Sequence, residues 1–323
     1  MYVSTTLCIL FLVAPVPSAS ASDAFPRQSR LDAPAFQRIL SADSVCAIPG
    51  TSEVAILDRE SKKIWAVDPE AGSVQVAHEL VAPDIPSGVR ANRLWSGHGR
   101  LFLDLTGEPY FVSIDLESGT FLDIPGLTHV LSMAPSAHGF VVVADLEQSR
   151  FALTDRDLVV REVFGSRCPV RPDEDVLALA CFSSVASAGQ GNVLVCDDLT
   201  GACFEFDVVT HEKATFRGAE VDWSMPERRG SNQILVERRV MAVAETPNGR
   251  RLVLCTAAGL YGEPTLEVYG SDGLTLSIPL GGDYQQMSVV GEDLVVALEP
   301  GPGFRAALVH IGAEVQVLAE EVE

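Results

Sequence analysis

One pattern recurs along the chain and limits what it can fold into. An apolar segment ending in Asp is followed by a polar turn and a second apolar segment that also ends in Asp. Three copies place the two aspartates ten residues apart: Asp58 with Asp68, Asp145 with Asp155, and Asp197 with Asp207. Short apolar segments separated by polar turns are typical of β-hairpins. The repeat therefore predicts a chain built from similar hairpins.

Three less regular copies extend the series. One has Asp104 and Asp115 eleven residues apart, and two degenerate copies cover residues 252–269 and 295–310. The residues that end the first strand of each hairpin, which we call anchors, lie at positions 58, 104, 145, 197, 256 and 299. The copies thus recur every 41 to 59 residues, and a further apolar segment flanks each hairpin on both sides. This period is typical of a four-stranded β-propeller blade.

We therefore predict an all-β fold, a six-bladed β-propeller of four-stranded antiparallel blades covering residues 41–323. A single blade cannot bury both of its faces, whereas blades stacked around an axis cover each other. Two β-sandwiches would also contain many short strands, but they do not predict six roughly evenly spaced copies of one motif. A seven-bladed ring is a further alternative, and the six copies favour six blades.

The first 21 residues have the features of a secretory signal peptide. They carry no charge, contain the apolar run 7–13, and end in the small-residue motif Ala19-Ser20-Ala21. The absence of Lys and Arg near Met1 departs from the usual pattern. The apolar run is too short to span a bilayer. We expect a signal peptide at 1–21, a flexible leader at 22–40, and a secreted or periplasmic protein.

The charge of the chain excludes two classes of partner. It has 23 Lys and Arg against 44 Asp and Glu, for a net charge of −21. Nucleic acids and anionic lipid surfaces both attract basic proteins, so neither is an expected partner. We expect no membrane insertion, and a monomer that contacts an unknown protein or small-molecule partner.

Six cysteines remain after the predicted cleavage. They are Cys46, Cys168, Cys181, Cys196, Cys203 and Cys255. Cys196 and Cys203 flank a hairpin turn, and Cys168 and Cys181 bracket the segment entering the fourth blade, so each pair is a candidate disulfide. Cys46 and Cys255 fall two blades apart and are expected to be buried thiols. The alternative is that all six are reduced. No Cys or His spacing typical of zinc sites occurs.

Two long segments between blades are candidate binding elements, because insertions in repeat proteins often carry function. The segment 218–233 holds a Trp and two arginines, residue types that anchor many interfaces. The segment 165–175 is stiffened by two prolines. With Asp283, they supply the candidate binding residues Asp173, Asp175, Asp222, Trp223, Arg228, Arg229 and Asp283. The alternative for Trp223 is that it packs over the mouth of the channel.

Catalytic motifs are scarce. No Gly-x-Ser-x-Gly occurs, and the six histidines are scattered along the chain. We therefore favour a binding or scaffolding module without a cofactor over an enzyme. The alternative is a divalent-metal-dependent hydrolase or lactonase that holds Ca²⁺ or another divalent metal, because hard cations prefer oxygen ligands. Its metal ligands would be Asp173, Asp175, Asp222 and Asp283.

The repeated aspartates have two interpretations. An Asp at the end of a strand commonly accepts hydrogen bonds from the backbone N–H groups of its own turn. We expect that role for Asp58 and the equivalent aspartates. The alternative is a ring of carboxylates that binds Ca²⁺ or a cationic partner.

The hairpins 54–68, 141–155 and 193–207 resemble those of the six-bladed β-propeller superfamily, which includes NHL, TolB-like and gluconolactonase-like proteins. This resemblance implies the fold, which hosts unrelated functions. In gluconolactonase-like enzymes a Glu, an Asn and an Asp hold a divalent metal near the channel. Here the first blade begins with Ser41-Ala42-Asp43-Ser44 and lacks the Glu-Gly-Pro start of that group. This departure weakens the expectation of a lactonase.

Overall fold

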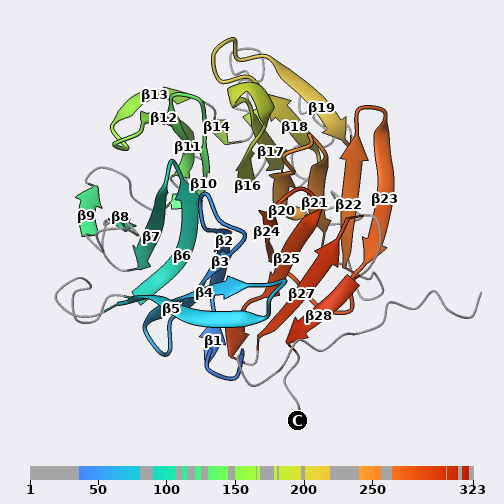
Figure 1. The fold of residues 1–323 in the computed structure, drawn as a ribbon. Coiled ribbons are helices and arrows are strands. Elements are labelled where there is room, and N and C mark those ends of the chain that lie inside the picture. The colour runs from blue at the N-terminus through green and yellow to red at the C-terminus, as the bar shows by residue number, and fades with distance from the viewer. Residues whose placement is uncertain are drawn as a thin grey trace, which may run out of the picture.

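The computed structural model describes residues 36–80, 90–106, 111–114, 121–124, 130–144, 150–164, 166–167, 178–179, 182–197, 201–218, 240–255, 264–302, 304–311 and 315–319. These residues form six four-stranded antiparallel sheets arranged around a common centre (Figure 1). The chain is thus a six-bladed β-propeller, which confirms the predicted fold class. No helix among the described residues is long and apolar enough to cross a membrane.

Each of the first three blades is built from consecutive strands. Blade 1 contains β2 (Ser44–Ala47), β3 (Val54–Asp58), β4 (Lys63–Asp68) and β5 (Ser73–Glu79). Blade 2 contains β6 (Arg90–Gly97), β7 (Arg100–Thr106), β8 (Phe111–Ile114) and β9 (Phe121–Ile124). Blade 3 contains β10 (Val130–Pro135), β11 (Gly139–Ala144), β12 (Arg150–Asp155) and β13 (Val160–Phe164).

The other three blades follow the same order. Blade 4 contains β16 (Phe182–Ser187), β17 (Val193–Asp197), β18 (Cys203–Phe206) and β19 (Lys213–Arg217). Blade 5 contains β20 (Val240–Glu245), β21 (Arg251–Cys255), β22 (Thr265–Gly270) and β23 (Gly273–Pro279). Blade 6 contains β24 (Gln286–Val290), β25 (Leu294–Glu299), β27 (Arg305–His310) and β28 (Val315–Ala319).

Two short strand pairs lie outside the blades. A parallel pair, β14 (Ser166–Arg167) and β15 (Ala178–Leu179), lies between blades 3 and 4 in the sequence. An antiparallel pair joins β1 (Ser41–Ala42) to β26 (Gly301–Pro302), which lies between β25 and β27 in the sequence. A 3₁₀ turn, η1 (Gly189–Gly191), connects β16 to β17.

The second strand of a blade is buried on both faces. In β3 the side chains of Val54 and Ile56 pack in a cluster with blade 6, whereas those of Ala55 and Leu57 pack in a cluster with blade 2. Successive side chains of a strand point to opposite faces, so an unbroken apolar run is what a sheet covered on both sides requires. Six such clusters fill the six junctions between neighbouring blades.

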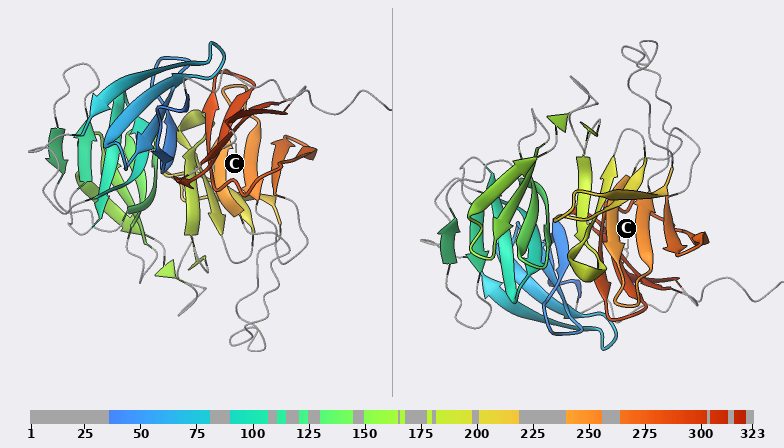
Figure 2. Two further views of the ribbon diagram at one scale, coloured as in Figure 1. Left: turned by 90° about the horizontal axis from the view of Figure 1, so that it is seen from below. Right: turned by 90° about the horizontal axis from the view of Figure 1, so that it is seen from above.

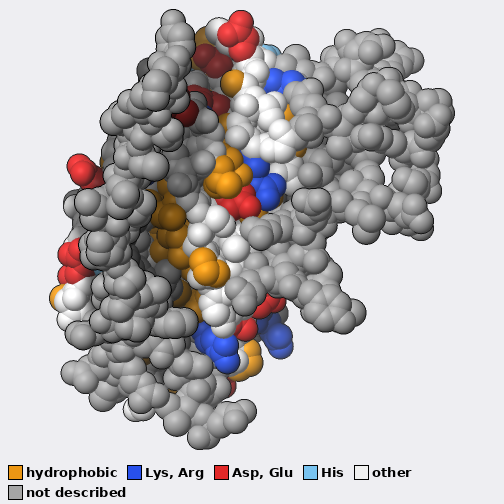
Figure 3. Space-filling view, turned by 90° about the vertical axis from the view of Figure 1, so that its right-hand side faces the viewer, with side chains coloured by type: hydrophobic (Ala, Val, Ile, Leu, Met, Phe, Trp, Pro, Cys, Tyr) orange, Lys and Arg blue, Asp and Glu red, His pale blue; other side chains and the backbone are white. Residues whose placement is uncertain are grey.

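The outer strands are more exposed than the strands inside the ring. Figure 1 places β5, β9, β13, β19, β23 and β28 at the rim. In β23, Leu274 is 56% exposed and Leu276 is 38% exposed. Viewed from the side of the ring where β23 lies, hydrophobic, basic and acidic atoms are interspersed on the described surface (Figure 3).

Side-chain hydrogen bonds join the innermost strands of neighbouring blades. The Ser44 hydroxyl accepts from the N–H of Leu94 in blade 2 at 3.0 Å. The Ser132 hydroxyl accepts from Val185 N–H in blade 4 at 3.0 Å. Where the ring closes, the Gln286 amide accepts from the N–H of Val45 and donates to the carbonyl oxygen of Asp43. These bonds satisfy backbone groups that have no partner strand on the channel side.

The ring closes through an N-terminal segment. β1 pairs with β26, and the side chains of Phe36 and Ile39 are 3% and 4% exposed in the cluster between blades 6 and 1. Both residues lie in the range 22–40 that we expected to be a flexible leader. Packing against the propeller therefore begins before residue 41, because these two apolar side chains cover the junction between the first and last blades.

The connections between strands lie on two opposite faces of the ring. Antiparallel order places the turn between second and third strands at the same end as the segment entering the next blade. We call this end the loop face, and the other end, which carries the remaining turns, the turn face. Figure 2 shows the ring edge-on with the two ends separated. The long segments between blades thus emerge on the loop face.

Candidate functional site

The structure describes only part of the predicted binding set. Asp222, Trp223, Arg228 and Arg229 lie outside the described residues. Asp173, Asp175, Cys168 and Cys181 also lie outside them, so the predicted Cys168–Cys181 disulfide stays a prediction. Asp283 is described and exposed, in the segment that joins β23 to β24 on the loop face.

The best-defined polar cluster on the loop-face side lies between blades 4 and 5. It starts from a row of three residues across blade 4, in which Cys203 pairs with Cys196 on one side and with Arg217 on the other. Cys196 and Cys203 form the predicted disulfide, with Cα atoms 4.3 Å apart. Arg217 is the last residue of β19, and the long segment containing the predicted binding residues follows it in the sequence.

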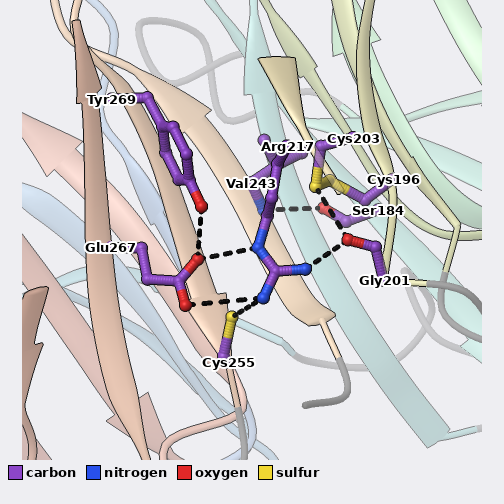
Figure 4. The surroundings of a disulfide bond; sticks show 9 residues. All are labelled: Ser184, Cys196, Gly201, Cys203, Arg217, Val243, Cys255, Glu267 and Tyr269. Carbon is purple, nitrogen blue, oxygen red and sulfur yellow. Dashed lines mark hydrogen bonds and ion pairs between the residues drawn. A yellow bond between two sulfur atoms is a disulfide. The ribbon is translucent and has the colours of Figure 1, made fainter. Parts of the chain in front are cut away.

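The Arg217 guanidinium crosses from blade 4 to blade 5 (Figure 4). Its Nε donates to Oε2 of Glu267 at 2.7 Å, and its Nη2 lies 3.4 Å from Oε1 of the same carboxylate. Nη2 also lies 3.3 Å from Sγ of Cys255, and Nη1 donates to the carbonyl oxygen of Gly201. The Tyr269 hydroxyl donates to Oε2 of Glu267 at 2.7 Å. We call Arg217, Glu267, Tyr269, Cys255 and Gly201 the blade 4–5 network.

The network is nearly closed to solvent and its charges are paired. The side chains of Arg217 and Glu267 are 13% and 8% exposed. Burial alone would lower the pKa of Arg217, but the hydrogen bond and charge of Glu267 raise it above its ordinary value. Burial also raises the pKa of Tyr269, and the adjacent carboxylate raises it further. Arg217 is therefore fixed as a cation and Tyr269 as a neutral hydrogen-bond donor.

A second pair of charges lies nearer the turn face of the same junction. Arg251 forms an ion pair with Glu205, and its guanidinium carbon lies 5.3 Å from the centre of the Phe216 ring. The Phe216 ring in turn meets the Tyr269 ring edge-on at 5.6 Å. Burial raises the pKa of Glu245, and the charge of Glu205 raises it further, whereas the hydrogen bond from the N–H of Gly189 lowers it. Blades 4 and 5 are thus held together by polar contacts along their depth.

Polar side chains also gather where the inner strands of blades 6, 1 and 2 begin. Arg59 forms an ion pair with the buried Asp43 at 2.7 Å. The Asn92 amide donates to Asp104 at 3.1 Å. Burial lowers the pKa of Arg93, whereas the negative charge of Asp104 acts in the opposite direction and raises it. These groups make the loop-face end of the inner strands polar between blades 6 and 2.

Asp58 caps its own turn, as predicted. Asp58 is fully buried and accepts from the N–H groups of Glu60 and Ser61 in its own turn. It also accepts from Leu40 N–H at 2.8 Å and from the Trp65 indole at 3.3 Å, which ties the N-terminal segment to blade 1. The strand-ending residues Asp68, Asp155 and Asp207 accept from their own turns in the same way.

The anchors do not occupy equivalent positions. Asp58 shares the face of Ile56, which packs against blade 6, the preceding blade. Asp104 lies on the strand face opposite that of Leu103, which packs against the preceding blade 1. The alternation of side chains along a strand therefore turns Asp58 and Asp104 toward different neighbours. These two carboxylates cannot belong to one ring around the axis.

The free cysteines agree with the prediction. Cys46 and Cys255 are both buried thiols. Burial raises the pKa of Cys46 to about 12, opposed by a hydrogen bond with Ser96, so this thiol is unreactive at neutral pH. Within the described ranges, no group of three or more His, Cys, Asp and Glu side chains is arranged to hold a metal ion.

Sequence reasoning missed Arg217, Glu267 and Tyr269. One signal was available: Glu267 interrupts the apolar run Leu266-Glu267-Val268 in a central strand, where charged side chains are rare unless they are paired. The partner could not be identified, because Arg217 is 50 residues away in another blade. Chemically, the network can hold the ends of β19 and β21 in place, since all its described members are hydrogen-bonded.

Comparison with known proteins identifies the fold. No protein-family model and no curated protein sequence matches the chain. Among solved structures, virginiamycin B lyase from Staphylococcus aureus has a TM-score of 0.53 and 9% identity over 88% of this chain and 86% of that one. A putative gluconolactonase has a TM-score of 0.53 and 13% identity over 87% and 91%. The extracellular domain of a putative hybrid two-component system from B. thetaiotaomicron has a TM-score of 0.51 and 10% identity over 88% and 34%.

These neighbours share an architecture and differ in function. At 9 to 13% identity the similarity defines the class of protein, a six-bladed β-propeller, and no particular activity. The function must therefore be argued from the residues of this chain.

Proposed function

We propose that the protein is an exported binding or scaffolding module that contacts a protein or small-molecule partner through its loop face. The observation that carries this proposal is the blade 4–5 network. It is a buried, hydrogen-bonded cluster at the root of the longest segment between blades, and rigid support below a segment that carries binding residues is a common design of binding sites.

The residues proposed to touch the partner follow from the sequence. Trp223 and Arg228 belong to the segment that begins just after Arg217. Trp and Arg bury large areas and form directional bonds, so they often carry most of the binding energy of an interface. Asp222, Arg229, Asp173 and Asp175 would complete the contact.

Export is part of the proposal. The described disulfide supports it, since disulfides persist in oxidising compartments outside the cytosol. The net charge of −21 is compatible with a soluble exported domain.

The test is partner capture with the mature protein immobilised. Extracellular or periplasmic extract from the source cells is passed over wild type, Trp223→Ala and Arg228→Ala, and retained molecules are compared by mass spectrometry. Arg156→Ala is the matched control, because Arg156 is exposed in a turn on the opposite face. We expect ligands retained by wild type and the control to be lost from both loop variants. Equal retention by all four proteins would contradict the proposed site.

A metal-dependent hydrolase is the second candidate, and one observation favours it. Oε2 of Glu299 is buried and has no hydrogen-bond partner among the described residues. It lies close to Gly282, where an added Cβ would be 3.0 Å away, and Gly282 precedes Asp283 in the sequence. Two carboxylates on neighbouring segments of the loop face could contribute oxygen ligands to a divalent cation.

A further inference from the structure

The disulfide and the ion pair between blades 4 and 5 are linked through one strand position. Cys203 lies in β18 between Cys196 of β17 and Arg217 of β19, as their direct partner in both registers. The β18–β19 ladder is irregular at this point, between Cys203 and Phe204. Regular pairing therefore holds the inner half of the row, where the disulfide adds a covalent crosslink, and does not continue into its outer half.

The turn closed by the disulfide supplies an acceptor to Arg217. Gly201 and Ala202 precede Cys203, and the Gly201 carbonyl oxygen accepts from Nη1 of Arg217. The chain after Arg217 also packs on this turn. Gly218 has a φ of +70°, and a Cβ placed there would lie 3.2 Å from Cα of Ala202. The disulfide thus positions both the acceptor and the surface against which the end of β19 rests.

The other side of the guanidinium binds blade 5. Nε and Nη2 face Glu267, and Nη2 faces the Cys255 thiol (Figure 4). A guanidinium has a planar, fixed arrangement of donors, so an acceptor held at one end orients the donors at the other. The orientation of Arg217 toward blade 5 therefore depends on the position of Gly201 in blade 4.

We propose that the Cys196–Cys203 disulfide is a redox-sensitive clamp that controls how firmly blade 4 is held to blade 5 on the loop face. A dithiol reductant would transfer two electrons to the disulfide: its S–S bond breaks, two cysteine thiols form, and the dithiol becomes a cyclic disulfide. The turn carrying Gly201 then loses its crosslink, and Arg217 loses a fixed acceptor. The Arg217–Glu267 pair remains but is held less firmly, and the junction opens locally.

This clamp is a property of the fold, and it holds whether or not the loop face binds a partner. Only its effect on binding rests on the proposed function. Among the described residues, one further cysteine lies at this junction: Cys255, whose contact with Arg217 places a free thiol on the blade 5 side. Replacing Cys255 with Ser leaves the disulfide intact and excludes exchange with the Cys255 thiol as the cause of any effect.

Native-state amide hydrogen exchange tests the clamp directly. Cys255→Ser is compared oxidised and after treatment with dithiothreitol, with the disulfide state checked by mass. We expect peptides from β19 and β22 to exchange several-fold faster after reduction, while peptides from β3 and β25 are unchanged. Unchanged exchange in β22, or equal acceleration in every blade, would overturn the proposal. Failure of the disulfide to be reduced before global unfolding would overturn it as well.

A thermal-melt cycle separates this effect from the general effect of a crosslink. Any disulfide restrains the unfolded chain, so reduction should lower the melting temperature even without a clamp. We expect reduction to lower it by several degrees in wild type, and by clearly less in Arg217→Met and Arg217→Lys. The Lys variant keeps the charge for Glu267 but cannot hold Gly201 and Glu267 together, which protects the test if the Met variant does not fold. Equal shifts in wild type and the Lys variant would show that Arg217 is not part of the device.

Discussion

Nε of Arg217, in the outer strand of blade 4, lies 2.7 Å from Oε2 of Glu267 in the third strand of blade 5. The pair is nearly buried, and hydrogen bonds from Tyr269 and to Gly201 complete the coordination of both charges. Burying two charges costs solvation energy that is recovered only when geometry and hydrogen bonding are good. We therefore regard this pair as a buried polar link between the two blades below the proposed binding segment.

Removing one partner of this pair should be costly. Arg217→Met leaves the Glu267 carboxylate buried without its guanidinium partner, so we expect unfolding in denaturant to show a loss of about 3–5 kcal/mol. Arg161→Met is the matched control: its ion pair with Asp155 is exposed, with Arg161 65% exposed, and such pairs contribute about 1 kcal/mol or less. Similar losses in the two variants would mean that the buried pair has no special role.

Asp58 should be as important for closing the ring as the Arg217–Glu267 pair is for joining blades 4 and 5. Asp58→Ala removes the acceptor of four backbone N–H groups and of the Trp65 indole. Unsatisfied buried donors are expensive, so we expect a loss of about 3–4 kcal/mol and a changed Trp65 fluorescence spectrum before unfolding. Asp68→Ala, whose turn is exposed, should cost below about 1 kcal/mol. If both changes cost the same, Asp58 does not secure the N-terminal segment.

The stability of the folded protein should depend on pH, because aspartates cap its turns. The N–H groups of Thr210 and Val209 hold the pKa of Asp207 below its ordinary value of 3.8. A carboxyl group whose pKa is lower in the folded state stabilises that state at pH values above 3.8. This stabilisation is lost as the pH falls through the folded-state pKa. Asp207→Asn keeps an oxygen acceptor but lacks the charge. We expect wild type to melt above the variant at neutral pH, and the gap to close as the pH falls below 3.8.

A matched surface change controls for net charge. Asp272→Asn removes one exposed carboxylate in a turn of blade 5. The difference in melting temperature between wild type and Asp272→Asn should not shrink in the same way as the pH falls. A gap for Asp207→Asn that stays constant down to the lowest pH would refute the assignment.

Metal content distinguishes the two candidate functions. For the binding module we expect no bound metal by mass spectrometry, and the same melting temperature in Ca²⁺ and in EDTA. A specific ion at about 100 times its dissociation constant would instead stabilise the fold by about 2.7 kcal/mol, enough to raise the melting temperature by several degrees. Stoichiometric metal that is lost from both Asp283→Asn and Glu299→Gln would favour the hydrolase. Glu79→Gln, outside this region, is the control.

The hairpin between Cys196 and Cys203 shows what local sequence could predict. Polar turns between short apolar runs define strands wherever they occur, and the two cysteines flank one such turn, so strand pairing brings them together. The same local logic predicted that Asp58 caps its own turn. The buried state of Cys46 and Cys255 also followed from their place in apolar strands.

Contacts between blades could not be predicted from the local sequence. Whether a strand residue faces the preceding or the following blade changes with a shift of one residue, as Asp58 and Asp104 show. Phe36 and Ile39 look like leader residues because nothing near them in the sequence marks the surface they cover.

The sequence by itself determined the repeat, the strands, the number of blades and the one disulfide that lies within a hairpin, because all of these depend on residues close together in the chain. The tertiary structure decided how the ring closes, which way each aspartate points, and that Arg217 meets Glu267. Those outcomes depend on side chains from different blades, whose approach is set by how whole sheets pack around the axis.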